Sequence, residues 1–233
     1  MNRRRFIGAL AVGGVGAVAG CLSDTEATTF SAAPARVSED AAAEAGYEYR
    51  GTKRWIDETD VGGETVEVTS YCSVYDRSID LPAEQFGEEP LRAGAFGVFA
   101  APQVSVSGEE FDPLGEFSNR QLAERAQNHY ADLEIVRAVG GRALEALGER
   151  FSLQSYEGTA TLQETYEIGV VLDTIQRTHE GDYVALAAVY PTDDVLSGAS
   201  EEGRIDTLIR GLVQYDDLEV EIVEDDDTDG SGD

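Results

Sequence analysis

Apolar and polar residues alternate over most of the chain between residues 47 and 191, and this period of two is typical of β-strands that bury one face. The segment 64–76 shows the pattern clearly, with Val66 and Val68 on one face and Glu67 on the other. Strands are expected over residues 30–37, 47–58, 64–76, 93–102, 133–139, 151–162, 166–178 and 182–191.

Three segments carry the signals of helices instead. Ser38 precedes the alanine-rich segment 39–45, which Gly46 ends. Ser118 and Gln121 have the spacing of a capping box at the start of a second helix. Apolar positions at helical spacing extend this helix through Leu122, Ala126, His129, Tyr130 and Leu133. A third helix is expected to begin at Ser200 and to present the stripe Ile205, Leu208, Ile209 and Leu212.

Short turns connect the strands that follow one another. Residues 59–63 contain two glycines and predict a hairpin, and residues 179–182 predict a second one. Sequential strands with tight turns, and helices at the flanks, favour an α+β fold in which helices pack on an antiparallel sheet. The body after the leader has one cysteine, Cys72, so its core must hold this domain together without an internal disulfide.

The first residues have the layout of a secretory leader. Arg3 and Arg4, followed by Phe6, match the twin-arginine export pattern. The apolar run that follows is about 22 Å long as a helix, at ~1.5 Å per residue, and a hydrocarbon core is about 30 Å thick. Residues 18–21 match a lipobox, in which the thiol of Cys21 takes the lipid. We therefore expect an exported protein, anchored by lipid to the outer face of the cytoplasmic membrane.

The pattern divides the chain into four parts. They are a twin-arginine signal peptide at residues 1–20, a lipidated tether at 21–29, a single α+β domain at 30–223 and a disordered acidic tail at 224–233.

The charge of the chain indicates the environment in which the protein works and does not alter the predicted fold. The chain has 46 acidic and 17 basic residues, a formal net charge of −29, and the acids are dispersed over the polar positions. Such a surface suits high salt, because at about 1 M the Debye length is only about 3 Å and repulsion is screened. A patch for a basic partner would require clustering. Nucleic acid is excluded as a partner, because no basic stripe is present to neutralise phosphates.

Several segments form a recognisable combination with this acidic body. They are RRRF at residues 3–6, AVAGC at 17–21, AAPQVSVSG at 100–108 and GDYVALAAVYP at 181–191. Together they resemble a haloarchaeal family of twin-arginine-exported lipoproteins of unknown function. The order of elements is also similar to the Mog1-like and photosystem-accessory fold. That second resemblance implies a binding role, although a fold does not determine a function.

Few residues of the body are suited to metal chemistry. Cys72, His129 and His179 lie far apart in the sequence, whereas zinc sites need clustered ligands. We expect a buried thiol at Cys72 on the apolar face of its strand, a partly buried packing histidine at His129, and solvent exposure for His179 in a turn. No metal and no cofactor are expected.

Sequence motifs of catalysis are equally scarce. Asp225, Asp227 and Asp229 resemble the start of an EF-hand loop, but the glutamate that such a loop needs at its twelfth position is missing. Ser197 and Ser200 lie near glycines in the wrong frame for a nucleophile elbow. Paired carboxylates could hydrolyse glycosides, yet 46 acids single out no pair. We therefore do not expect an enzyme.

The remaining candidates are aromatic side chains on the predicted hairpin. Tyrosine and tryptophan combine apolar area with a polar tip, so they could line a groove for a partner or a small ligand. A helix covering that face would make them core instead. These residues are Tyr47, Tyr49, Trp55, Tyr71 and Tyr75.

The function we expect is that of a lipid-anchored binding or accessory module outside the cell, adapted to high salt. Its contacts would be the membrane, through the lipid on Cys21, and a protein or small molecule that the sequence does not identify. Two alternatives stay open: a cell-envelope hydrolase using carboxylates, and a structural spacer. A deep pocket with convergent polar groups would favour the hydrolase, and an apolar patch would favour binding.

Overall fold

The computed structural model describes residues 28–115, 117–193, 195–196 and 200–223. They form an α+β fold, in which a large, mostly antiparallel sheet of nine strands carries four helices. This confirms the predicted fold class. The leader, Cys21 and the acidic tail lie outside the described residues.

The large sheet contains all the long strands. Its members are β1 (Thr28–Ser31), β3 (Glu48–Val61), β4 (Glu64–Ile79), β5 (Leu91–Pro102), β8 (Tyr130–Ala146), β9 (Glu149–Leu162), β10 (Tyr166–His179), β11 (Asp182–Pro191) and β13 (Ile222–Val223). The order across the sheet is β13–β3–β4–β5–β11–β10–β9–β8, and β1 lies against β4. Two small sheets accompany it, one of β2 (Ala35–Val37) with β12 (Leu212–Gln214) and one of β6 (Val104–Val106) with β7 (Glu109–Phe111).

Both predicted hairpins are present. Gly62 and Gly63, each with positive φ, join β3 to β4, and Glu180 and Gly181 join β10 to β11. The predicted strand 30–37 is instead two strands, β1 and β2. Because β1 pairs with β4 from Thr28 onward, the last residues expected in the tether belong to the sheet.

The helices are α1 (Glu39–Ala45), α2 (Ala83–Phe86), α3 (Asn119–Arg125) and α4 (Glu202–Arg210). The side chain of Ser38 caps α1, and Gly46 ends it in the left-handed conformation. Ser200 Oγ accepts a hydrogen bond from the backbone N–H of Glu202, at the start of α4. None of the described helices is long and apolar enough to cross a membrane.

The second helix is shorter than predicted. The capping box of Ser118 and Gln121 is present, but α3 ends at Arg125. Gln127 Oε1 accepts hydrogen bonds from the backbone N–H groups of His129 and Tyr130, both at 2.6 Å. This side chain turns the backbone into β8, so the apolar residues Tyr130 and Leu133, expected on a helix, lie on a strand.

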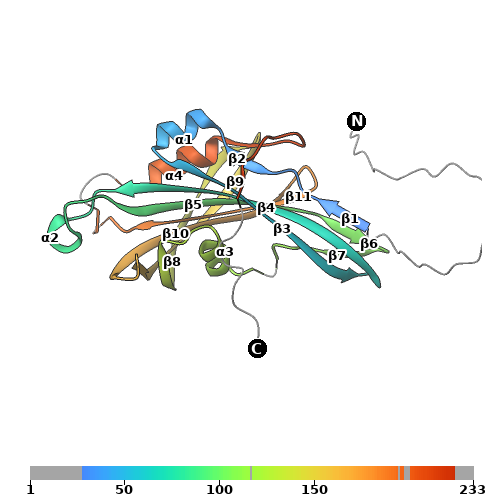
Figure 1. Cartoon of the computed structure of the whole chain (residues 1–233), viewed down its shortest axis with the longest axis horizontal. Coiled ribbons are helices and arrows are strands. Elements are labelled where there is room, and N and C mark those ends of the chain that lie inside the picture. Colours follow the sequence, from blue (N-terminus) through green and yellow to red (C-terminus); the bar gives the residue numbers. More distant parts are fainter. Residues whose placement is uncertain (1–27, 116, 194, 197–199, 224–233) are drawn as a thin grey trace, which may run out of the picture.

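The two faces of the sheet are covered by different elements. Helices α1 and α4 lie side by side on one face, which we call the α1/α4 face, together with β2 and β12 (Figure 1). Helix α3 lies on the opposite face, which we call the α3 face.

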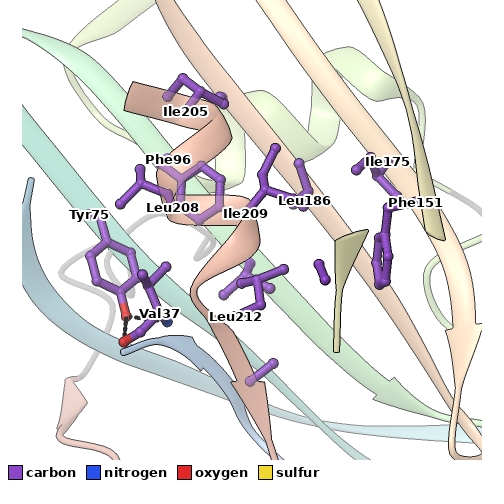
Figure 2. Packing of buried hydrophobic residues seen from close by; sticks show 14 of the residues in the cluster. Val37, Tyr75, Phe96, Phe151, Ile175, Leu186, Ile205, Leu208, Ile209 and Leu212 are labelled. Atoms are coloured by element: carbon purple, nitrogen blue, oxygen red, sulfur yellow. Dashed lines mark hydrogen bonds between the residues drawn. The ribbon is translucent and has the colours of Figure 1, made fainter. Parts of the chain in front are cut away.

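The core of the α1/α4 face is continuous. Figure 2 shows Ile205, Leu208 and Ile209 of α4 pointing toward Phe96 and the neighbouring strands. These side chains are 0 % exposed. The three apolar α4 residues predicted from helical spacing are therefore confirmed as core, and Leu212, the fourth, joins them from β12.

A buried ion network ties α4 to the sheet on the same face. Arg142 of β8 donates to Asp173 Oδ2 of β10 at 2.8 Å and to Asp206 Oδ1 of α4 at 2.7 Å. Ser155 and Tyr190 also donate to Asp173, which is 0 % exposed. Burial opposes the charge of Arg142, but the hydrogen bonds and charges of Asp173 and Asp206 outweigh it and raise its pKa. Each charged group of this network already has its partners.

The core of the α3 face is built around the start of β8 and the short helix α3. Cys72, Phe99, Leu122 and Leu133 belong to it, each at most 2 % exposed. Gly97 lets α3 approach β5 directly, because a Cβ at this position would lie 2.5 Å from Cβ of Ala126. Since α3 has only seven residues, it covers part of this face, and a separate small core of Val61, Val66, Val68, Val104 and Val106 lies at the end near β6 and β7.

Candidate functional site

A cavity of about 370 Å³ opens on the α3 face, between the β3–β4 hairpin and the segment that leads into α3. The segment between β7 and α3 forms one wall, and the sheet forms the opposite wall. The lining residues are Trp55, Asp57, Glu58, Thr59, Val68, Ser70, Tyr71, Phe99, Phe111, Pro113, Leu114, Phe117 and Arg125.

The floor of this cavity is aromatic because strand register brings two rings together. Trp55 lies opposite Ser70 in the β3–β4 pair, and Phe99 lies opposite Cys72 in the β4–β5 pair. Both rings therefore point to the α3 face. They stack with centroids 6.4 Å apart and planes inclined by 14°. Trp55 is only half-buried, so part of its ring faces the cavity.

The opposite wall comes from a segment that makes no contact with the hairpin through backbone pairing. Phe111 ends β7, and Phe117 precedes the N-cap of α3. Both rings are half-buried. Together with Trp55 and Phe99 they give the cavity four aromatic walls, an arrangement that suits a flat apolar molecule.

Arg125, the last residue of α3, adds a positive charge to these walls. Its guanidinium carbon lies 4.3 Å from the ring centroid of Phe117 and 5.6 Å from that of Trp55, within cation–π range. Arg120, on the same helix, pairs with Glu124 at 3.0 Å. Within the described part of the chain, Arg125 has no such carboxylate partner.

The acidic groups of the cavity lie at its rim. Asp57 and Glu58 are exposed residues of β3, and Ser70 lies deeper, at 7 % exposure. No hydrogen bond or ion pair between described residues joins Asp57 or Glu58 to Arg125. The cavity therefore has an apolar interior, one cationic group on its wall and solvated carboxylates at its mouth.

The structure does not bring the five predicted aromatic residues together. Tyr47 and Tyr75 are buried at 3 % and 1 % exposure in the core of the α1/α4 face, and Tyr49 packs against the same core. Figure 2 shows the Tyr75 hydroxyl at Val37, whose backbone N–H donates to it at 2.8 Å. Burial raises the pKa of Tyr75, which keeps the hydroxyl neutral. The core alternative is thus confirmed for Tyr47 and Tyr75.

The other two of these residues line the cavity. Trp55 faces it directly, whereas Tyr71 borders it and also packs against the core of the α1/α4 face. The predicted groove on the hairpin therefore reduces to the region of Trp55. Its remaining walls, Phe111, Phe117 and Arg125, come from outside the hairpin and were missed. Their signal in the sequence is the aromatic pair that flanks the segment 112–116, before the capping box.

His129 is half-buried as expected, but its environment is ionic rather than apolar. Its Nε2 lies 3.1 Å from Oδ2 of the buried Asp76, which Arg50 and Arg92 also contact. Burial opposes the ionisation of Asp76, yet the hydrogen bonds from His129 and Arg50 and the charges of Arg50 and Arg92 outweigh it and hold its pKa below the usual value. This cluster is a second closed ion network.

The expectation for His179 is wrong. The residue is 8 % exposed, because the β10–β11 turn lies against the start of β9. Its Nδ1 is 3.2 Å from Oε1 of Glu149, and Arg177 pairs with the same carboxylate. Cys72, by contrast, is buried, as predicted.

No group of three or more metal-ligating side chains that could hold a metal ion is found within the described residues. The predicted acidic run Asp225, Asp227 and Asp229 lies outside them, and so does Ser197. The cavity at Trp55 is therefore the candidate site that the described residues support.

Comparison with known proteins gives a family and no activity. No match was found among curated proteins. Residues 34–213, which hold α1, α3, α4 and every long strand, match the family described as "Domain of unknown function (DUF6517)". Since this match spans most of the chain, the protein belongs to the DUF6517 family.

Proposed function

We propose that this protein is an extracytoplasmic binding domain, anchored by lipid at Cys21, that takes a small apolar ligand in the cavity at Trp55. The observation that carries the proposal is the half-buried Trp55 beside three phenylalanine rings around about 370 Å³ of space. Apolar walls with a few polar groups are typical of ligand sites. The dispersed acidic surface supports a high-salt environment, as argued from the sequence.

The polar groups of the cavity favour binding over hydrolysis. Hydrolysis would need a nucleophile or two carboxylates held at defined distances by hydrogen bonds. Asp57 and Glu58 are exposed, and the side chain of Ser70 has no hydrogen bond among the described residues. A structural spacer has no use for an aromatic cavity. The resemblance to the Mog1-like fold adds support for a binding role.

The membrane location follows from the leader motifs and has its own test. Cys21→Ser, after confirmed leader cleavage, should release the protein from membranes into the medium, because the thiol that carries the lipid is gone. Arg3 and Arg4, both replaced by lysine, should block export. Membrane retention of the Cys21→Ser protein would contradict the anchor.

Ligand binding can be tested through Trp55, because it is the single tryptophan of the chain. N-phenyl-1-naphthylamine is a neutral apolar probe that fluoresces when it leaves water. In molar KCl, it should bind one-to-one and accept excitation energy from Trp55, because transfer requires both rings to be close. Binding without energy transfer, or no saturable binding, would contradict the proposed site.

A further inference from the structure

We propose that the ligand of this cavity carries an acidic group, a carboxylate or a sulfonate, and that Arg125 binds this group. The inference rests on the proposed function, since it names the class of ligand for the same site. Its basis is the way in which the guanidinium of Arg125 is held.

The guanidinium of Arg125 packs against two aromatic rings, and its N–H donors have no hydrogen-bond partner among the described residues. The guanidinium carbon lies 4.3 Å from the Phe117 centroid, so the ring packs against the guanidinium. A guanidinium has five N–H donors in its plane. No hydrogen bond or ion pair between described residues uses them. Their geometry matches the two oxygens of a carboxylate or sulfonate.

Several arginines elsewhere in the described structure have carboxylate partners. Arg142 binds Asp173 and Asp206, and Arg50 binds Asp76 at 2.6 Å. The whole chain has 46 acidic residues for 17 basic ones. Arg36, Arg54, Arg125 and Arg150 have no carboxylate partner among the described residues, and of these four Arg125 lines the cavity, where its donors are available to a ligand.

A cationic ligand fits the same geometry poorly. Such a ligand would need the open faces of Trp55 and Phe117, and Arg125 already lies over both rings. The carboxylates of Asp57 and Glu58 at the rim would repel an anion in dilute buffer. At about 1 M salt the Debye length falls to about 3 Å, so these exposed charges act only at contact.

Two probes that differ by one acidic group test this inference. 8-Anilinonaphthalene-1-sulfonate has the ring system of N-phenyl-1-naphthylamine plus a sulfonate. Each is titrated in molar KCl into the wild-type protein, the Arg125→Gln variant and the Arg120→Gln variant, with energy transfer from Trp55 as the signal. Arg120→Gln is the matched control, because it removes an arginine from the same helix outside the cavity lining.

We expect the wild-type protein to bind the sulfonate about tenfold more tightly than the neutral probe, as charge-assisted hydrogen bonds imply. Arg125→Gln should abolish this preference and leave the affinity for the neutral probe within about twofold, whereas Arg120→Gln should keep the preference. Equal wild-type affinity for both probes, or a preference that survives Arg125→Gln, would overturn the acidic ligand and leave the proposed function intact. Binding of neither probe would overturn both.

Discussion

The two faces of the sheet each place an arginine near aromatic or buried side chains, and they use it in opposite ways. On the α1/α4 face, Arg142 is bound by Asp173 and Asp206 beneath α4. On the α3 face, Arg125 packs on Phe117 and Trp55 and has no described carboxylate partner. Arg142 stabilises the packing of α4 on the sheet, and Arg125 borders the cavity.

The difference follows from what covers each face. Two helices and the β2–β12 pair lie on the α1/α4 face, and α4 packs its apolar stripe into a continuous core. Helix α3 covers part of the other face with seven residues, and Pro113, Leu114 and Phe117 complete the wall of the cavity. A closed face stabilises, whereas an open face has room for a ligand. Both faces carry a large buried core, and the α3 face in addition has a cavity for a ligand beside its helix.

The largest expected effect is that of Arg142→Gln. This change leaves the carboxylate of Asp173 buried without its charged partner, which should lower the free energy of unfolding by about 3–5 kcal/mol. Urea unfolding in molar KCl, followed by circular dichroism, measures it. A loss below about 1 kcal/mol would show that the network under α4 does not hold this face.

Two phenylalanines of β5, which point to opposite faces, test the comparison with losses of stability that reach the size expected for Arg142→Gln. Phe96 lies in the closed core, and Phe99 borders the cavity. Phe96→Ala should cost about 3–5 kcal/mol, and Phe99→Ala about 1 kcal/mol less, because the cavity already lies on one side of Phe99. The urea unfolding midpoints of the two variants, at the same salt concentration, measure this difference in stability. The reverse order would mean that the cavity closes in solution.

The smallest expected effect on stability is that of Arg125→Gln. The side chain is exposed and loses only its cation–π contacts, worth about 0.5–1 kcal/mol at exposed sites. The same urea titration measures this change. A loss as large as that of Arg142→Gln would place Arg125 among the structural arginines and contradict the comparison.

Much of the fold could be predicted because it depends on local signals. Alternation identified β4, an apolar run identified β5, glycines identified the two hairpins, and Ser38 and Ser118 marked the starts of two helices. The end of α3 could not be predicted from apolar spacing, because Tyr130 and Leu133 suit a helix or a strand equally. The side chain of Gln127 decides between them.

The site was less predictable because its walls meet only in three dimensions. Trp55 could be selected as an aromatic residue on a strand, but its face depends on the register of β3. The same register places Tyr75 in the core of the α1/α4 face. The aromatic residues predicted to lie together are therefore divided between the two faces of the sheet. Phe117 and Arg125 reach the cavity only through the placement of α3 on Gly97. The burial of His179 likewise depends on its contact with Glu149.

The most direct measurement uses the single tryptophan again, this time by NMR. Protein labelled with 5-fluorotryptophan should give one ¹⁹F resonance, from position 55. The account predicts that 8-anilinonaphthalene-1-sulfonate in molar KCl shifts this resonance, and that Arg125→Gln raises the probe concentration needed for half of the shift about tenfold. A resonance that does not move in the wild-type protein, while the probe binds, would contradict the assignment of the binding site to the open face.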